Sequence, residues 1–275
     1  MNASTSARVP GSGLDGALPS RVEGFGAWIL DVIDACGQFA LLALLTLRAA
    51  TRPRFPALET VRQMEAVGAR STTIVLITAL FTGMVLALQT GIALARFGAK
   101  PYVGSVVGLS LARELGPVLT ALMVGGRVGA GITAEIGAMQ VTEQVDAIRS
   151  MGADPVQKLV LPRVIAATLA LPLLTIMADV LGVVGGMLLS WGQFGIDPNF
   201  YLQTIFNTVT VGDFVSGIVK TFAFGWIIAM VGCFSAFRTS GGTVGVGRAT
   251  TRAVVTASIA VLVSDFFLTQ LLVLL

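Results

Sequence analysis

The sequence predicts an all-α integral membrane protein with five transmembrane helices, an N-terminal interfacial helix and a cytoplasmic helix between two spans. Hydrophobic residues make up 55% of the 275 residues and charged residues only 12%, against roughly 25% charged in ordinary globular domains. Five apolar runs have about the length that crosses a bilayer. Lys and Arg gather in alternate loops between these runs, which is typical of polytopic membrane proteins.

The composition excludes several classes of protein. There is no histidine, and the two cysteines, Cys36 and Cys233, both lie in apolar runs. This excludes catalysis by histidine and a disulfide framework, and no metal site or catalytic residue is predicted. None of the three lysines stands in a G-x-x-x-x-G-K-[ST] motif, so no ATPase site is predicted in this chain. The net charge of +3 follows the loops, so no nucleic-acid partner is predicted.

The predicted spans cover about residues 71–95, 102–126, 164–190, 214–237 and 253–275. They belong to a membrane domain over residues 63–275, which follows an interfacial or elbow region over 25–62 and a disordered tail over 1–24. Phe25 to Leu47 is long enough to span, but Asp31, Asp34 and Gln38 form a polar stripe at helical spacing. This pattern favours a helix in the membrane interface over a full crossing.

The distribution of Lys and Arg predicts the orientation. Basic residues occur before the first span, between the second and third, and between the fourth and fifth, whereas residues 191–213 contain none. The N-terminus, the 127–163 segment and the 238–252 loop are therefore predicted to face the cytoplasm. The C-terminus follows an odd number of spans, which predicts that it is periplasmic.

Five ionisable residues, drawn from four spans, are predicted to lie in one layer near the middle of the membrane. Counting about 1.5 Å per residue along each span brings together Arg113, Glu114, Asp179, Lys220 and Asp265. A charge in hydrocarbon needs partners or water, which leaves two interpretations. The charges form structural ion pairs, for example Arg113 with Asp179 and Lys220 with Asp265, or they line a polar cavity that touches a cargo. The cavity is favoured for Arg113 and Glu114, and ion pairing for Asp179 and Asp265.

Pro117 is predicted to disturb the second span and is placed with the structural polar layer. It has no N–H to donate to the carbonyl of Arg113, which leaves that acceptor free and predicts a kink beside the charged pair.

A helix is predicted over about residues 132–152, between the second and third spans. Its polar face bears Glu135, Glu143, Asp146 and Arg149, and Gly152 is placed to end it. One interpretation is a solvated helix that rests on the membrane surface. The other is a coupling helix that inserts into a cytoplasmic motor domain, with these five residues as the coupling set.

Three stretches of the chain resemble a known family. ARELGPV (112–118), GGRVGAGITAEIGAMQVTEQVDAIRSMGADP (125–155) and GRATTRAVV (247–255) are similar to the MlaE/YrbE family of ABC-transporter permeases. The similarity covers roughly residues 66–275, and the 112–155 block is its most specific part.

The resemblance implies a homodimeric permease subunit in the bacterial inner membrane that moves phospholipid between the inner and outer membranes and maintains outer-membrane lipid asymmetry. Its partners would be two ABC ATPase subunits, which bind ATP and Mg²⁺, a periplasmic MCE-domain protein and often a STAS-domain protein on the ATPase. The chain itself would be no enzyme and would bind no cofactor. Arg113 and Glu114, with Lys220, would bind the lipid in a cavity at the dimer interface.

Two other functions stay open at the level of sequence. One is an ion-coupled secondary transporter in which Glu114, Asp179 or Asp265 carries protons. The other is a membrane scaffold without transport activity, in which the polar layer only stabilises the bundle.

Overall fold

A computed structural model describes residues 17–51 and 56–274 of the chain. Within these residues every regular element is helical and none is a strand, which confirms the all-α prediction. The chain forms two compact units, residues 1–45 and residues 46–275.

Helix α1 (Ala17–Ala50) accounts for the described part of the first unit and continues into the second. Helix begins at Ala17, so residues 17–24 are helical and the tail predicted over 1–24 is too long at its end; residues 1–16 lie outside the described residues. Arg21, Val22 and Glu23 carry no helix breaker between them. Ile33–Ala50 is apolar and long enough to cross a membrane, so its placement in the interface stays a prediction.

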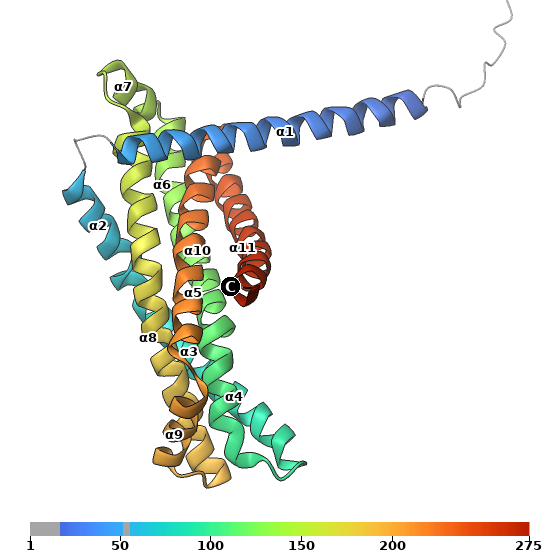
Figure 1. Cartoon of the computed structure of the whole chain (residues 1–275). Helices are drawn as coiled ribbons and strands as arrows, with labels where there is room; N and C mark the ends of the chain where they lie inside the picture. Colours follow the sequence, from blue (N-terminus) through green and yellow to red (C-terminus); the bar gives the residue numbers. More distant parts are fainter. Residues whose placement is uncertain (1–16, 52–55, 275) are drawn as a thin grey trace, which may run out of the picture. The chain divides into compact units, whose positions relative to one another are not determined.

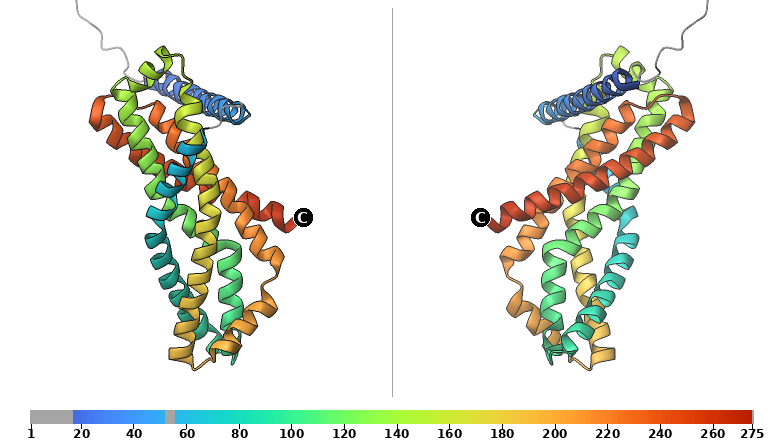
Figure 2. Two further views of the ribbon diagram at one scale, coloured as in Figure 1. Left: turned by 90° about the vertical axis from the view of Figure 1, so that its left-hand side faces the viewer. Right: turned by 90° about the vertical axis from the view of Figure 1, so that its right-hand side faces the viewer.

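The second unit is a bundle of long helices (Figure 1). Its helices in chain order are α2 (Ala57–Val67), α3 (Ala69–Ala95), α4 (Val103–Ser110), α5 (Gly116–Val124), α6 (Ala130–Val141), α7 (Gln144–Ser150), α8 (Leu161–Phe194), α9 (Pro198–Thr208), α10 (Val211–Phe237) and α11 (Gly242–Leu274). Five helical segments of this unit are long and apolar enough to cross a membrane, and they include the five predicted spans. The short helices α7 and α9 lie at opposite ends of the bundle (Figures 1 and 2).

The second membrane segment is one continuous helical path from Lys100 to Val141. It opens with the 3₁₀ turn η1 (Lys100–Tyr102), and two π-helical turns, η2 (Leu111–Leu115) and η3 (Gly125–Gly129), separate α4, α5 and α6. Its 42 residues would measure about 63 Å as a regular helix, twice the roughly 30 Å hydrocarbon core. The segment is therefore longer than the membrane is thick. Its last helix, α6, lies at the same end of the bundle as α7.

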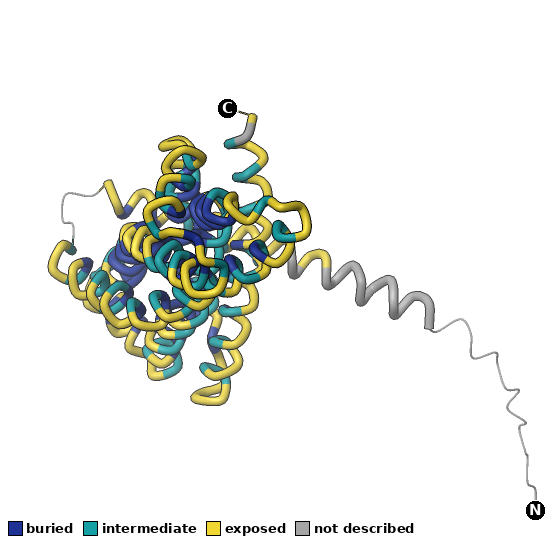
Figure 3. The backbone as a smooth tube through the Cα atoms, turned by 90° about the horizontal axis from the view of Figure 1, so that it is seen from below, coloured by how far each residue is buried: buried dark blue, intermediate teal, exposed yellow. Residues whose placement is uncertain are grey.

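Helix α8 follows the π-helical turn η4 (Val156–Val160) and packs against α2, α3 and α10. The approach to α3 is close because glycines face each other: a Cβ on Gly83 would overlap the carbonyl of Gly182. Small residues at such a crossing let two membrane helices pack backbone to backbone. The buried residues of the bundle accordingly lie along its interior (Figure 3).

The single helix predicted over 132–152 is wrong in one respect, because the chain breaks between α6 and α7. Glu143 has a φ of 60°, the left-handed conformation that non-glycine residues seldom adopt. The hydroxyl of Thr142 donates to the carbonyl of Ala138 at 2.8 Å, so this side chain binds a carbonyl of the last turn of α6. The predicted stop is confirmed: α7 ends at Ser150, and Gly152 has a φ of 74°.

Candidate functional site

The ammonium group of Lys220 is the centre of the charged layer. The Lys220 side chain is only 1% exposed, and its Nζ lies 2.8 Å from Glu114 Oε1 and 3.3 Å from Asp265 Oδ1. Nζ also donates to the hydroxyl of Thr269 at 2.6 Å. Helices α10 and α11 and the turn η2 thus meet at one buried cation. The predicted pairing of Lys220 with Asp265 is confirmed, and Glu114 completes the group.

The disturbance predicted at Pro117 takes the form of the π-helical turn η2, which ends at Leu115. The carbonyl of Arg113, which Pro117 leaves without a donor, accepts a hydrogen bond from Lys220 Nζ at 3.1 Å. A Cβ on Gly217 would overlap the carbonyl of Ala112, so α10 touches the turn directly. The irregular turn therefore places backbone oxygen, as well as the Glu114 carboxylate, around the ammonium group.

Arg113 pairs with Asp213. The ion pair between Arg113 and Asp179, which the sequence predicted as an example, is therefore wrong. Arg113 Nε lies 2.6 Å from Asp213 Oδ1. The other oxygen of Asp213 accepts from the backbone N–H of Thr210 at 2.8 Å, and Asp213 N–H donates back to the Thr210 hydroxyl at 3.3 Å. This capping box fixes the carboxylate at the first turn of α10.

Asp213 and Thr269 are members of this network that the sequence analysis did not single out. Asp213 lies one residue before the span predicted from 214, so it was counted with the loop. The pattern Thr210-x-x-Asp213 before an apolar run is a recognisable helix start and could have placed Asp213 on the helix. No sequence signal marks Thr269, whose role depends on how α11 is rotated.

The network is closed on one side and open on the other. The side chains of Asp213 and Asp265 are 8% and 18% exposed, whereas those of Arg113 and Glu114 are 50% and 39% exposed. Charges that remain exposed at mid-height of a membrane bundle must face water, a second polar surface or a ligand. The ion-pair interpretation therefore holds for Arg113 and Glu114, which are both paired. The cavity interpretation stays a prediction, and the exposed parts of the two side chains are compatible with it. We call Arg113, Glu114, Asp213, Lys220, Asp265 and Thr269 the charged cluster.

Asp179 lies apart from the charged cluster, on the other side of the second segment. It is buried, and neither carboxylate oxygen has a hydrogen-bond partner among the described residues. A Cβ on Gly116 would overlap Asp179 Oδ1, so the carboxyl group lies directly against α5. The ion pair predicted for Asp179 is wrong, because Arg113 points instead toward α10.

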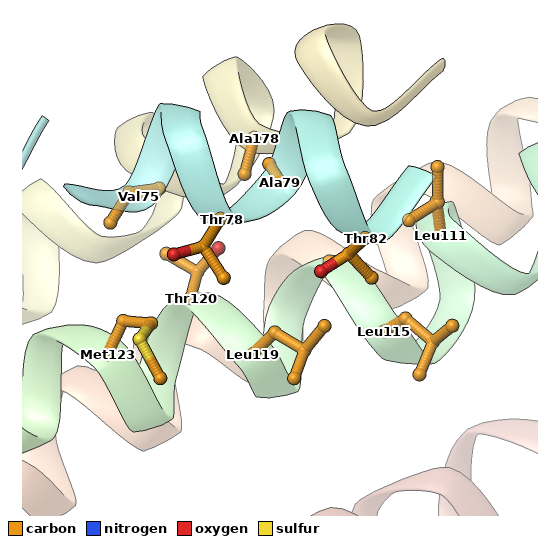
Figure 4. A pocket seen from close by; sticks show the side chains of 11 residues that line it. Val75, Thr78, Ala79, Thr82, Leu111, Leu115, Leu119, Thr120, Met123 and Ala178 are labelled. Atoms are coloured by element: carbon orange, nitrogen blue, oxygen red, sulfur yellow. The ribbon is translucent and has the colours of Figure 1, made fainter. Parts of the chain in front are cut away.

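A small cavity of about 20 Å³ lies between α3, α5 and α8, and its lining includes Gly116 and Ala178. Figure 4 shows the hydroxyl groups of Thr78, Thr82 and Thr120 among mostly apolar side chains that line it. This volume is about that of one water-sized probe, so the cavity is far too small for a lipid tail.

The predicted coupling residues lie at the α7 end of the bundle and do not form one surface. Glu143, Asp146 and Arg149 are exposed on α7 or beside it, and Arg149 Nη1 lies 3.0 Å from Asp146 Oδ1. Val145 and Ile148 are buried, so α7 is amphipathic as predicted. Glu135 differs, because its carboxylate lies 2.8 Å from the Nη2 of Arg163 on α8. Glu135 therefore already has a partner, Arg163, within the same chain.

These observations define a class of protein: a multi-pass membrane protein with a charged cluster inside the bundle and an exposed amphipathic helix at one end. No group of three or more metal-binding acidic or cysteine residues occurs in the part of the chain that the structure describes. Such an arrangement is that of a transporter subunit, and comparison with known proteins identifies which one. Residues 60–271 match the family model of the permease MlaE, so the chain belongs to the MlaE family of ABC-transporter permeases.

Individual relatives agree with the family. A Rickettsia typhi protein named probable ABC transporter permease is 42% identical, over 90% of this chain and 95% of its own length. The intermembrane phospholipid transport system permease protein MlaE of Haemophilus influenzae is 36% identical, over 91% and 97%. The chloroplast protein TRIGALACTOSYLDIACYLGLYCEROL 1 of Arabidopsis thaliana is 40% identical, over 77% of this chain and 60% of its own.

Proposed function

We propose that this chain is the permease subunit of an ABC transporter that moves phospholipids between the inner and outer membranes of a bacterium. The observation that carries the proposal is the exposure of Arg113 and Glu114 at the open face of the charged cluster. A phospholipid presents an anionic phosphate, often beside a cationic group, and two apolar tails. An Arg guanidinium binds phosphate through directed, charge-assisted hydrogen bonds, and Glu114 offers an acceptor for a cationic head group.

The open face also supports a homodimer. One protomer leaves Arg113 half exposed, and apolar side chains of α11 such as Ile259 and Phe266 are more than half exposed. A second copy would enclose this face and form a cavity with charged and apolar walls, which is what a lipid requires. The name of the Haemophilus influenzae relative, which specifies phospholipid transport, supports this choice of cargo.

The partners follow from the family and from the α7 end of the bundle. The proposed complex contains two ATPase subunits, which bind ATP and Mg²⁺, a periplasmic MCE-domain protein and a STAS-domain protein on the ATPase. The exposed polar face of α7, with Glu143, Asp146 and Arg149, is the proposed dock for the ATPase. The distribution of Lys and Arg predicts that α7 lies in the cytoplasm and α9 in the periplasm, where the ATPase and the MCE-domain protein would bind.

The ion-coupled alternative has one observation in its favour. Asp179 is a buried carboxyl group without a partner among the described residues, and unpaired acidic groups in membrane helices often carry protons. Glu114 and Asp265 fit this role less well, because both are bound to Lys220.

Reconstitution distinguishes the two functions. The complete complex in proteoliposomes is expected to move labelled phospholipid only with hydrolysable ATP and the partner ATPase. Movement that ignores ATP and follows an imposed proton gradient would contradict the proposal. The Asp179→Asn variant serves as a second measurement, because only the ion-coupled mechanism requires that its proton dependence disappear.

A further inference from the structure

One buried cation joins two helices at the α7 end of the bundle. The side chain of Arg163, at the start of α8, is only 4% exposed, and its Nη2 lies 2.8 Å from Glu135 Oε1 on α6. Its Nη1 donates to the carbonyl of Leu159 at 2.7 Å. Arg163 Nε has no partner among the described residues. Among the described residues, Glu135 is the carboxylate that pairs with this guanidinium.

The pair stands where the chain leaves the bundle and returns to it. Helix α6 leads into α7, and the turn η4 leads back into α8 at Leu161. Arg163 therefore contacts both the outgoing and the returning segment. It binds the Glu135 side chain on α6 and the Leu159 backbone in the turn η4. A planar guanidinium that holds two acceptors at once restricts both distance and angle.

The neighbouring contacts extend the connection to α10. The hydroxyl of Thr133 donates to the carbonyl of Gly232 at 3.1 Å. Cys233, the next residue, is fully buried and lies within electrostatic reach of both Arg163 and Glu135. Helices α6, α8 and α10 thus meet around this pair, and α8 in turn packs against α2 and α3.

We propose that the Arg163–Glu135 pair is a latch that makes α6, α7 and the start of α8 move together, so that ATPase movement at α7 reaches the rest of the bundle. The proposal rests on the proposed function and concerns positioning, because neither residue belongs to the charged cluster. It reassigns Glu135 from the docking surface to the connection behind it. The Glu135 side chain is 56% exposed, but Arg163 is only 4% exposed. Removal of the carboxylate therefore leaves a buried guanidinium without a counter-charge, which disfavours the arrangement in which α6 and α8 are joined.

The test uses the complete transporter in proteoliposomes, with ATP hydrolysis and phospholipid movement measured on the same sample. Glu135→Gln is expected to keep ATP hydrolysis and to lower the lipid moved per ATP by about two- to thirtyfold, the range of mutations that alter coupling. Exchanging the charges, with Glu135→Arg and Arg163→Glu together, is expected to restore part of the ratio. Glu59→Gln is the matched control, because Glu59 makes an exposed 3.9 Å pair with Arg62 on α2.

A second measurement follows the latch without any lipid. In a Cys36→Ser background, Cys233 is the single remaining cysteine, and it is fully buried. Glu135→Gln is expected to speed labelling of Cys233 by a thiol reagent, whereas Glu59→Gln leaves the rate unchanged. If Glu135→Gln does not assemble, Arg163→Lys keeps both charges but lacks the planar guanidinium that fixes the distance and angle to its two acceptors, and it is expected to lower the same ratio.

The outcomes separate the latch from the proposed function. A wild-type complex that moves no lipid with ATP contradicts the proposed function, and the labelling rate of Cys233 then still tests the latch. An active wild type with an unchanged lipid-to-ATP ratio in Glu135→Gln and Arg163→Lys overturns the latch. So does a parallel loss of hydrolysis, movement and assembled complex in both Glu135→Gln and Arg163→Lys, since that pattern indicates a purely structural pair.

Discussion

Lys220 binds Glu114 through a 2.8 Å contact in which the lysine side chain is 1% exposed and the glutamate 39% exposed. The cation is thus inside the bundle, and its partner reaches from the interior to the open face. Glu114 is one residue from Arg113, whose own carbonyl accepts from the same ammonium group. A single buried lysine therefore holds the Glu114 side chain and the backbone of Arg113, and so helps to fix the positions of both half-exposed side chains.

Lys220→Met is expected to destabilise the protein, because it leaves Glu114 and Asp265 facing each other without a cation. Breaking a buried ion pair on one side costs about 3–5 kcal/mol. The expected result is a clearly lower midpoint of thermal unfolding in detergent. Lys100→Met is the control, since Lys100 is exposed in the turn η1. An equal midpoint for the two variants would show that the contacts of Lys220 contribute nothing to the fold.

Arg113→Gln is expected to affect transport more than stability. Asp213 is only 8% exposed, but it keeps its hydrogen bonds from the Thr210 backbone N–H and hydroxyl, so loss of the contact with Arg113 costs about 1 kcal/mol of folding free energy. Loss of a charged hydrogen bond to a lipid phosphate costs about 1.5–3 kcal/mol, which predicts a roughly ten- to hundredfold fall in ATP-dependent lipid movement. Arg96→Gln, at an exposed position after α3, should retain full activity. A loss of stability without any loss of transport would favour the scaffold function instead.

A photo-crosslinking amino acid at position 113 or 114 is expected to capture phospholipid in the assembled transporter. The reason is that these positions line the open face of the charged cluster. The matched position is Leu271 on α11, whose side chain is 54% exposed and apolar. Recovery of lipid–protein adducts by mass spectrometry is the measurement. Labelling at 113 and 114 that does not exceed labelling at 271 would mean that these charges do not contact the cargo.

Of the five residues predicted to share one layer, the structure brings Arg113, Glu114, Lys220 and Asp265 together, because depth along a helix follows from residue count. Asp179 lies apart from them. Lys220 was matched to Asp265, and the free carbonyl of Arg113 was foreseen from Pro117. The partner of Arg113 was not, since lateral pairing depends on helix rotation and tilt, which residue counting does not provide. The π-helical turn η2 has more residues per turn than an α-helix. It therefore rotates the side chains that follow it in the second membrane segment relative to a regular α-helix.

The cytoplasmic segment shows a second limit. Its amphipathic pattern and its stop at Gly152 could be recognised, because both depend on local residue preferences. The break at Glu143 could not, since glutamate seldom adopts the left-handed conformation that it has here and its residue type does not signal it. The link from Glu135 to Arg163 was equally hidden, because the two residues are distant in sequence and meet only when α8 returns to the bundle.

Charge reversal on α7 is expected to weaken assembly with the ATPase. Glu143→Lys together with Asp146→Lys changes the sign of the exposed acidic face and also repels Arg149, which now pairs with Asp146. The measurement is the amount of ATPase that co-purifies with the tagged permease. Glu59→Lys together with Glu65→Lys, on α2, makes the same change of net charge and is the control. Equal recovery from both variants would exclude this face of α7 as the dock.

Thr210→Ala is expected to disturb the charged cluster from outside it, because Thr210 holds Asp213 through its backbone N–H and its hydroxyl. The backbone contact survives the substitution, and the two bonds of the hydroxyl are lost, so the helix start loses about 1 kcal/mol. Asp213 then becomes free to turn away from Arg113. A modest loss of stability together with a several-fold slower ATP-dependent lipid movement is therefore expected. Thr210→Ser keeps the hydroxyl and should restore both quantities, and if it behaves like the alanine variant, the capping hydroxyl is not what positions Asp213.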